Sequence, residues 1–84
     1  MKLENIVKDN IYYNNYGEPI PFGSKIKMSF VGEPVDMTKP FTLVSAENIF
    51  STVSYKNEVE IKVSGANGVT HTFSFARWYN PKII

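Results

Sequence analysis

The side chains best suited to acid–base or nucleophilic chemistry are few in this sequence. His71 is the only histidine, and there is no cysteine. A zinc site needs three or four nitrogen, sulfur or carboxylate ligands, and these totals do not provide a typical set. Serine and aspartate are present, but no Gly-x-Ser-x-Gly elbow indicates a nucleophile with its base. We therefore interpret His71 as a partly buried structural residue.

The carboxylates and the glycine-rich stretch also lack the spacing of a reactive site. Glu58 and Glu60 are predicted to share the solvent face of one strand, beside Lys62. A glycosidase pair would need a cleft between its carboxylates, which so short a chain scarcely provides. Residues 65–68 lack the Lys-Ser/Thr of a phosphate loop and are predicted to form a hairpin turn. We expect no catalytic residue, no metal and no cofactor, and therefore no enzyme.

Two clusters of aromatic and cationic residues are the features most typical of binding. Tyrosine, tryptophan and arginine dominate binding hot spots because they combine a large, stiff contact area with a polar group. The clusters are Tyr12, Tyr13 and Tyr16 in an Asn-rich segment, and Arg77, Trp78 and Tyr79 near the end of the last predicted strand.

The predicted binding residues are Tyr13, Tyr16, Arg77 and Tyr79. Tyr12 and Trp78 are left out, since large aromatic residues are often buried and these two suit a core as well as a surface. Binding residues favour loops held by a rigid scaffold, and the two clusters form one surface if the first strand lies near the last. The cationic strand face at Lys25 and Lys27 is the next candidate.

The region from Glu58 to Trp78 carries the clearest structural pattern. Apolar and polar residues alternate on both sides of a Gly/Asn cluster, which is typical of a β-hairpin with one buried face. The residues predicted to lie on that face are Val59, Ile61 and Val63 before the cluster, and Val69, His71, Phe73 and Phe75 after it.

Parity restricts the turn of this hairpin. Directly paired residues share a face, so a two-residue loop at Asn67-Gly68 is excluded because it would set Val63 against Thr72. A three-residue loop over 66–68, with Gly68 in the left-handed conformation, keeps the apolar residues together. The expected pairs are Val59 with Phe75 and Ile61 with Phe73.

The remaining segments predict further short strands. These are 11–13, 25–31, 41–44 and 52–55, separated by a loop that ends near Ser24, a loop at 32–40, one helical turn at 45–48 and a turn at Lys56-Asn57. That last turn would pair Tyr55 with Val59 and Val53 with Ile61, so that the C-terminal half is a three-stranded meander. Residues 1–10 suit either a short helix or an edge strand.

The predicted fold class is mainly β. Five to six strands in one small chain indicate a small antiparallel barrel or a strongly twisted sheet, with one short N-terminal helix as an option. The 84 residues are predicted to form a single all-β domain, residues 1–84. A core of this size is modest and an open sheet leaves edges uncovered, so we expect a homodimer.

Composition and charge indicate which cellular compartment and which classes of partner to expect. No apolar run follows Lys2 and no stretch has the length of a membrane span, so we expect a cytoplasmic protein without membrane contact. Nine basic residues against eight acidic ones give a net charge of +1. Nucleic acid is therefore an unfavoured partner, since binding by phosphate neutralisation calls for a stronger positive field.

The function that this pattern favours is non-enzymatic binding. The chain would dock a protein or small-molecule partner through its loop aromatics. Small accessory and inhibitor proteins, of which phage and mobile elements encode many, are often chains of this kind, although that association does not come from the residues. The alternative is a single-strand nucleic-acid module of OB-like type, in which strand aromatics stack on bases beside Lys25 and Lys27.

Overall fold

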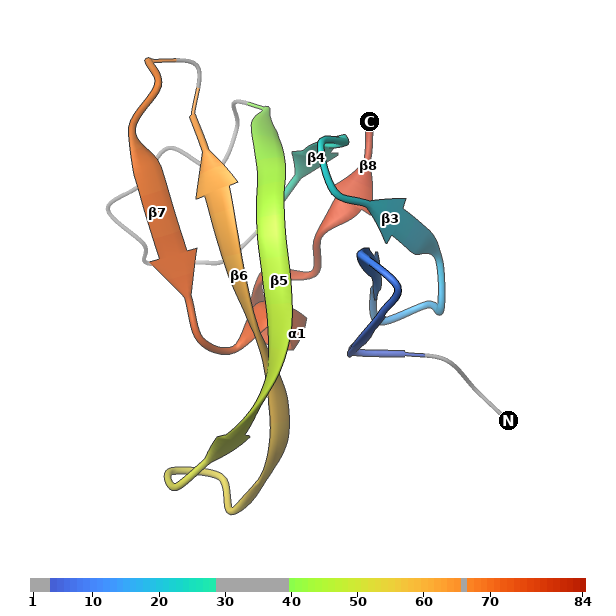
Figure 1. The fold of residues 1–84 in the computed structure, drawn as a ribbon, viewed down its shortest axis with the longest axis vertical. Helices are drawn as coiled ribbons and strands as arrows, with labels where there is room; N and C mark the ends of the chain where they lie inside the picture. Colours follow the sequence, from blue (N-terminus) through green and yellow to red (C-terminus); the bar gives the residue numbers. More distant parts are fainter. Residues whose placement is uncertain (1–3, 29–39, 66) are drawn as a thin grey trace.

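The computed structural model describes residues 4–28, 40–65 and 67–84, and these form a mainly β protein (Figure 1). Its elements in chain order are β1 (Ile6–Lys8), β2 (Ile11–Tyr13), β3 (Pro19–Pro21), β4 (Lys25–Lys27), β5 (Phe41–Ser51), β6 (Lys56–Ser64), β7 (Thr70–Phe73), α1 (Ala76–Tyr79) and β8 (Lys82–Ile83). The mainly β fold class is confirmed, in its twisted-sheet form.

Two antiparallel sheets make up the fold. The larger has five strands in the order β7-β6-β5-β4-β8, and the smaller has three in the order β1-β2-β3. The hairpin of β5 and β6 is the longest unit, and its far end projects beyond the other elements at the bottom of Figure 1. The short strands of the small sheet lie beside β5, so this sheet covers only part of the hairpin.

The core lies where the two sheets meet. Tyr12 and Ile20 contribute fully buried side chains from the small sheet, and Ile26, Leu43 and Ile61 contribute them from the large one. The Tyr12 hydroxyl donates a hydrogen bond to Asn5 Oδ1 at 3.2 Å, and burial raises the pKa of this phenol far above its usual range. Tyr12 is therefore a core residue with a satisfied polar end.

The predicted hairpin turn between β6 and β7 is confirmed. Ile61 pairs with Phe73, and the Gly65 amide donates to the Val69 carbonyl at 3.0 Å, which leaves a three-residue loop. Gly68 has φ of +81°, a conformation that a β-branched residue resists. Parity of the alternating residues was sufficient to fix this register.

Strand β7, the second strand of this hairpin, is shorter than predicted. It ends at Phe73, and Ala76–Tyr79 form the helix α1, so the expected pairing of Val59 with Phe75 is wrong. Asn80 ends the helix in the left-handed conformation with φ of 46°, and Pro81 follows, which is a common way for a helix to stop. The turn allows Tyr79 to pack on Phe73, with their ring centroids 4.5 Å apart.

Strand β5 is longer than predicted. Residues 45–48, predicted to form a helical turn, continue the strand instead, and the register with β6 shifts between Leu43 and Ser45. The shift leaves Val44 as the extra residue of a β-bulge, which adds local twist. Beyond the bulge, Ala46 rather than a residue of odd number packs against the core.

The connection between β5 and β6 also differs from the prediction. Residues 52–55, predicted as a strand, form the loop, and Lys56-Asn57, predicted as a turn, begin β6. The expected pairs of Tyr55 with Val59 and Val53 with Ile61 are therefore wrong. The Ser51 hydroxyl accepts hydrogen bonds from the amides of Val53 at 3.1 Å and Ser54 at 3.2 Å, which favours a turn directly after Ser51.

Residues near the N-terminus, which suited either a short helix or an edge strand, belong to the small sheet. Ile6–Lys8 form an edge strand rather than a helix, and a two-residue turn at Asp9 and Asn10, both with positive φ, joins it to β2. Pro19–Pro21, predicted as loop, form the other edge strand, where proline is tolerated.

The predicted strand at 25–31 and loop at 32–40 are only partly covered by the described residues. β4 accounts for Lys25–Lys27, whereas Met28, predicted to continue the strand, lies outside it. Pro40 lies outside any strand, as predicted. The remainder of both predictions falls on residues 29–39, which lie outside the described residues.

Phe73→Ala should reduce the free energy of unfolding by about 3–5 kcal/mol, because the side chain is buried and a cavity would remain. Val69→Ala, in the exposed turn of the same hairpin, is the control and should change it by less than about 0.5 kcal/mol. Urea denaturation monitored by circular dichroism measures both. A loss below about 1 kcal/mol for Phe73→Ala would contradict the assigned core face.

Candidate binding surface

The buried side chain of Asn14 organises the loop that follows β2. Its Oδ1 atom accepts hydrogen bonds from the amides of Tyr16 and Glu18, both at 3.0 Å. Its Nδ2 atom donates to the carbonyl of Pro81 at 2.9 Å. One side chain thus fixes the loop and ties it to the C-terminal segment.

Asn15 makes a second connection to the end of the chain. Its Nδ2 atom donates to the Arg77 carbonyl at 2.9 Å and to Asn80 Oδ1 at 3.2 Å. The segments that carry the two predicted clusters are therefore in contact. They meet through side-chain amides, although β2 and β8 belong to different sheets.

The predicted binding residues differ in how much of each side chain is exposed to solvent. Tyr16 is 66% exposed, and Lys82 Nζ lies 5.0 Å from its ring centroid. Tyr13 is half-buried in β2, where it pairs with Ile6 and Pro19. The fourth, Tyr79, is half-buried against Phe73. Tyr16 is the one with most of its surface available.

The Trp78 side chain is more exposed to solvent than expected for a residue that suited a core as well as a surface. It is 46% exposed and lies on α1, with its ring stacked on Phe75 at a centroid distance of 4.5 Å. The Arg77 guanidinium carbon lies 5.7 Å from the same indole ring. Tyr16, Arg77 and Trp78 are here named the aromatic loop surface.

Arg77 is also a structural residue, because it neutralises a buried carboxylate. Its Nε atom contacts both oxygens of Glu58, at 2.8 and 3.1 Å, and Glu58 is only 2% exposed. Ser54 Oγ donates to Glu58 Oε2 at 3.1 Å. The hydrogen bond from Arg77 holds the pKa of Glu58 below its usual range, although burial acts in the opposite direction. The expected solvent position of Glu58 is wrong.

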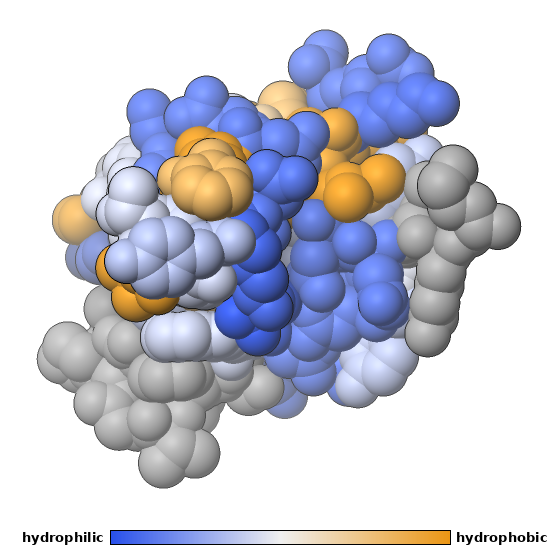
Figure 2. Space-filling model, turned by 90° about the horizontal axis from the view of Figure 1, so that it is seen from below, coloured by the Kyte–Doolittle hydropathy of each residue, from blue (hydrophilic) through white to orange (hydrophobic). Residues whose placement is uncertain are grey.

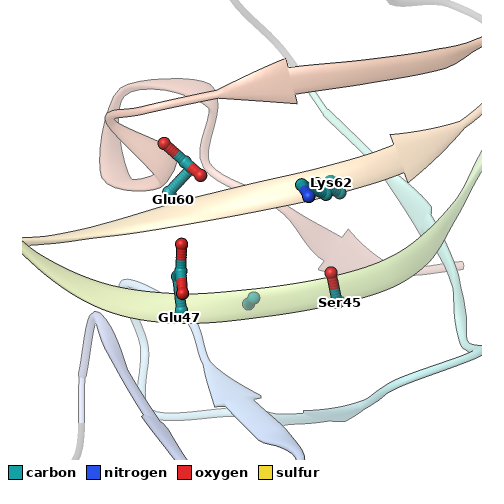
Figure 3. A pocket seen from close by; sticks show the side chains of 5 residues that line it. Ser45, Glu47, Glu60 and Lys62 are labelled. Atoms are coloured by element: carbon teal, nitrogen blue, oxygen red, sulfur yellow. The ribbon is translucent and has the colours of Figure 1, made fainter.

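Glu60 and Lys62 lie in a shallow hollow on the face of the β5–β6 hairpin (Figure 3). Glu47 pairs directly with Glu60, and Ser45 pairs with Lys62 two residues further along the strands. Like charges directly opposite each other repel, so this pair weakens the hairpin slightly. Lys62 is the cationic residue that lines the same hollow.

A cationic face lies on β4 and β8. Lys27 pairs directly with Lys82, and Lys25 shares the exposed side of β4. The two paired lysines flank a hollow that also contains Met28, Ile83 and Ile84. Because Lys82 also contacts the Tyr16 ring, this face continues into the aromatic loop surface.

Hydrophobic side chains also reach the surface at the far end of the β5–β6 hairpin. Figure 2 views the molecule from that end and shows separate hydrophobic patches within a mainly hydrophilic face. Phe50, Val53 and Tyr55 are the exposed apolar residues of this hairpin end. Two of them, Val53 and Tyr55, lie in the segment predicted as a strand, so an exposed tip was not expected there.

The fold and these surfaces define a small two-sheet β protein with exposed aromatic residues on loops. Comparisons with protein-family models, with curated protein sequences and with solved structures each found no match. Among the described residues, no helix is both long and apolar enough to cross a membrane.

The Glu58 carboxylate should make stability depend on pH in the acid range. Its folded pKa is depressed, so its stabilising contribution is complete above the unfolded value of about 4.3 and is lost as pH falls through the folded pKa. The melting temperature of the wild type should therefore exceed that of Glu58→Gln at neutral pH, and the two should converge as pH falls.

Melting temperatures measured by circular dichroism from about pH 7 to pH 2 test this convergence. Glu47→Gln, at an exposed position, is the control; it removes only the weak repulsion from Glu60, so its melting temperature at neutral pH should equal or slightly exceed that of the wild type. A difference between wild type and Glu58→Gln that stays constant down to the acid limit would contradict the role of the carboxylate.

Proposed function

We propose that this chain is a non-enzymatic binding protein that docks a protein or small-molecule partner through the aromatic loop surface. The observation that carries the proposal is Tyr16, which is 66% exposed on a loop whose backbone is fixed by the buried Asn14 amide. Arg77 and Trp78 on α1 extend the surface, because Asn15 holds the helix against the same loop.

Preorganisation makes this surface suitable for binding. A loop already fixed by buried hydrogen bonds loses little conformational entropy when a partner arrives. Tyrosine and tryptophan add contact area with few rotatable bonds. Tyr13 and Tyr79 are half-buried, so in this proposal they support the exposed residues and contribute edge contacts.

The finer parts of the proposal concern location and partner. A cytoplasmic location is supported by the absence of cysteine from the sequence. A role as an inhibitor encoded by a phage or mobile element rests only on small size and a binding surface, which is an association.

A second candidate function is single-strand nucleic-acid binding. It is favoured by the cationic face of Lys25, Lys27 and Lys82, which continues into Tyr16. Aromatic stacking beside backbone-tracking cations is how such modules bind. The net charge of +1 argues against it. Binding to oligothymidylate with an affinity that falls steeply with salt would favour this function over the first.

Tyr16→Ser should weaken partner binding by at least about tenfold, as expected for an aromatic hot spot. The melting temperature should stay nearly unchanged, because the ring is exposed. The partner is obtained by placing the photoreactive residue p-benzoyl-phenylalanine at position 16, identifying the crosslinked product by mass spectrometry, and purifying it for titration calorimetry.

Two further variants make the test specific. Val69→Ser, exposed in the β6–β7 turn, should leave affinity unchanged. Arg77→Ala should lower the melting temperature, because it leaves Glu58 buried without its partner. Equal affinity for the wild type and Tyr16→Ser would contradict the aromatic loop surface.

We also propose that two copies associate through a sheet edge. β7 is an edge strand of the larger sheet, and a second copy pairing along it would cover the backbone groups on its outer side. Sedimentation equilibrium at micromolar concentration should give twice the mass of the 9.6 kDa chain. A single-chain mass up to high micromolar concentration would contradict this association.

A further inference from the structure

We infer that the tip of the β5–β6 hairpin is a second docking element, which inserts into an apolar pocket with an acidic rim on a folded protein. The tip consists of Phe50, residues 51–54 and Tyr55. It shares with the proposed function only the assumption of a protein partner, since its residues are distinct from the aromatic loop surface.

Exposure of large apolar side chains is the first observation. Phe50 is 63% exposed, Val53 75% and Tyr55 80%, all within one hairpin end. Single exposed apolar residues are ordinary, but three large ones at one hairpin end with a polar surround are typical of an interaction site. Thr52, Lys56 and Asn57, all exposed, provide that surround.

Backbone conformation at Tyr55 is the second observation. It has φ of 54°, in the left-handed region that glycine or asparagine occupies more readily. A bulky residue there lowers stability, and the exposed ring regains little through packing. Contact between the phenol ring and a binding partner would account for a tyrosine at this position.

Rigidity of the loop is the third observation. The Ser51 hydroxyl accepts from the amides of Val53 and Ser54, and the Ser54 hydroxyl donates to the buried Glu58 carboxylate. Arg77 in turn holds Glu58 from α1. The tip is therefore presented in a fixed conformation, which reduces the entropic cost of association.

Shape and charge define the partner. The tip is convex and projects from the body, so its apolar residues need a concave apolar receptor (Figure 1). Lys56 is the only charged residue between positions 50 and 57, which favours a carboxylate at the rim of that receptor. A membrane surface is disfavoured, because stable anchoring of a small apolar insert needs several cations.

The test uses the full chain with p-benzoyl-phenylalanine at position 53, and with the same residue at exposed position 69 as the control. A protein crosslinked at 53 but not at 69 is identified and purified, and the attached partner residues are mapped. It is then titrated with wild type, Val53→Ser and Tyr55→Gly. Both variants should weaken its affinity by at least about tenfold, as expected for buried anchors.

Tyr55→Gly adds a readout that a merely structural role would not give. Glycine relieves the left-handed strain, so the melting temperature should rise by about 2–5 °C while affinity falls. A fall in both would mean that Tyr55 is a structural residue and would overturn the inference. Unchanged affinity in both variants would overturn it as well.

A membrane or a second copy of the chain, as alternative partners of the tip, would each give a distinct experimental result. Co-sedimentation of the chain with vesicles of phosphatidylcholine and phosphatidylglycerol, lost in Val53→Ser, would assign the tip to a membrane. A wild-type dimer that Val53→Ser converts to single chains would assign it to a second copy. Either result overturns the inference. Crosslinking at position 16 but not at 53 overturns only the tip, whereas no product at either position also overturns the protein-docking form of the proposed function.

Discussion

Side-chain amides hold the small sheet of this protein against the large one. Strands of three residues make few backbone hydrogen bonds, so β1, β2 and β3 would be marginal as an isolated sheet. Asn48 on β5 donates to the Val7 carbonyl at 2.9 Å and accepts from the Val7 amide at 3.0 Å. This amide provides the edge strand β1 with both hydrogen bonds that a neighbouring strand would supply.

Asn14 and Asn15 perform a related task at the other side of the small sheet. Their amide groups bind carbonyls of Pro81 and Arg77, which lie more than sixty positions away in the chain. Because Asn14 is fully buried, the loss of its partners would leave a costly unsatisfied amide. The surface formed by Tyr16 and Trp78 therefore depends on polar contacts beneath it as much as on the aromatic residues themselves.

Local patterns in the sequence predicted part of this fold correctly. The β6–β7 turn followed from parity, since Ile61, Val63 and Phe73 alternate without interruption. The first four residues of β5 were predicted as a strand, but its continuation from Ser45 was missed because the bulge at Val44 moves the inward-facing residues from odd positions, such as Leu43, to even ones, such as Ala46. When the alternation of apolar and polar residues changes phase within one strand, the sequence pattern matches neither a regular strand nor a helix.

The surface was harder to predict than the strands. Three tyrosines beside an Asn-Asn pair predicted a binding segment; Tyr16 is exposed on a loop, whereas Tyr12 is buried in the core, and binding by this segment stays a prediction. The contacts of Asn15 with α1 and of Glu58 with Arg77 span long stretches of chain, and no local pattern reports them. Glu58 in particular follows the alternation of an exposed face, yet it is buried where Arg77 of α1 and a serine of the β5–β6 loop contact its carboxylate.

Because of the bulge at Val44, β5 can lose one residue without changing the direction in which its other side chains point. Leu43 and Ser45 are already paired with successive residues of β6, Val63 and Lys62. Loss of the residue between them would give a regular ladder with every other side chain on its present face, and only the local twist would diminish. Loss of a residue elsewhere in β5 would turn part of the strand inside out. Position 44 is thus a place where this hairpin tolerates a change in length.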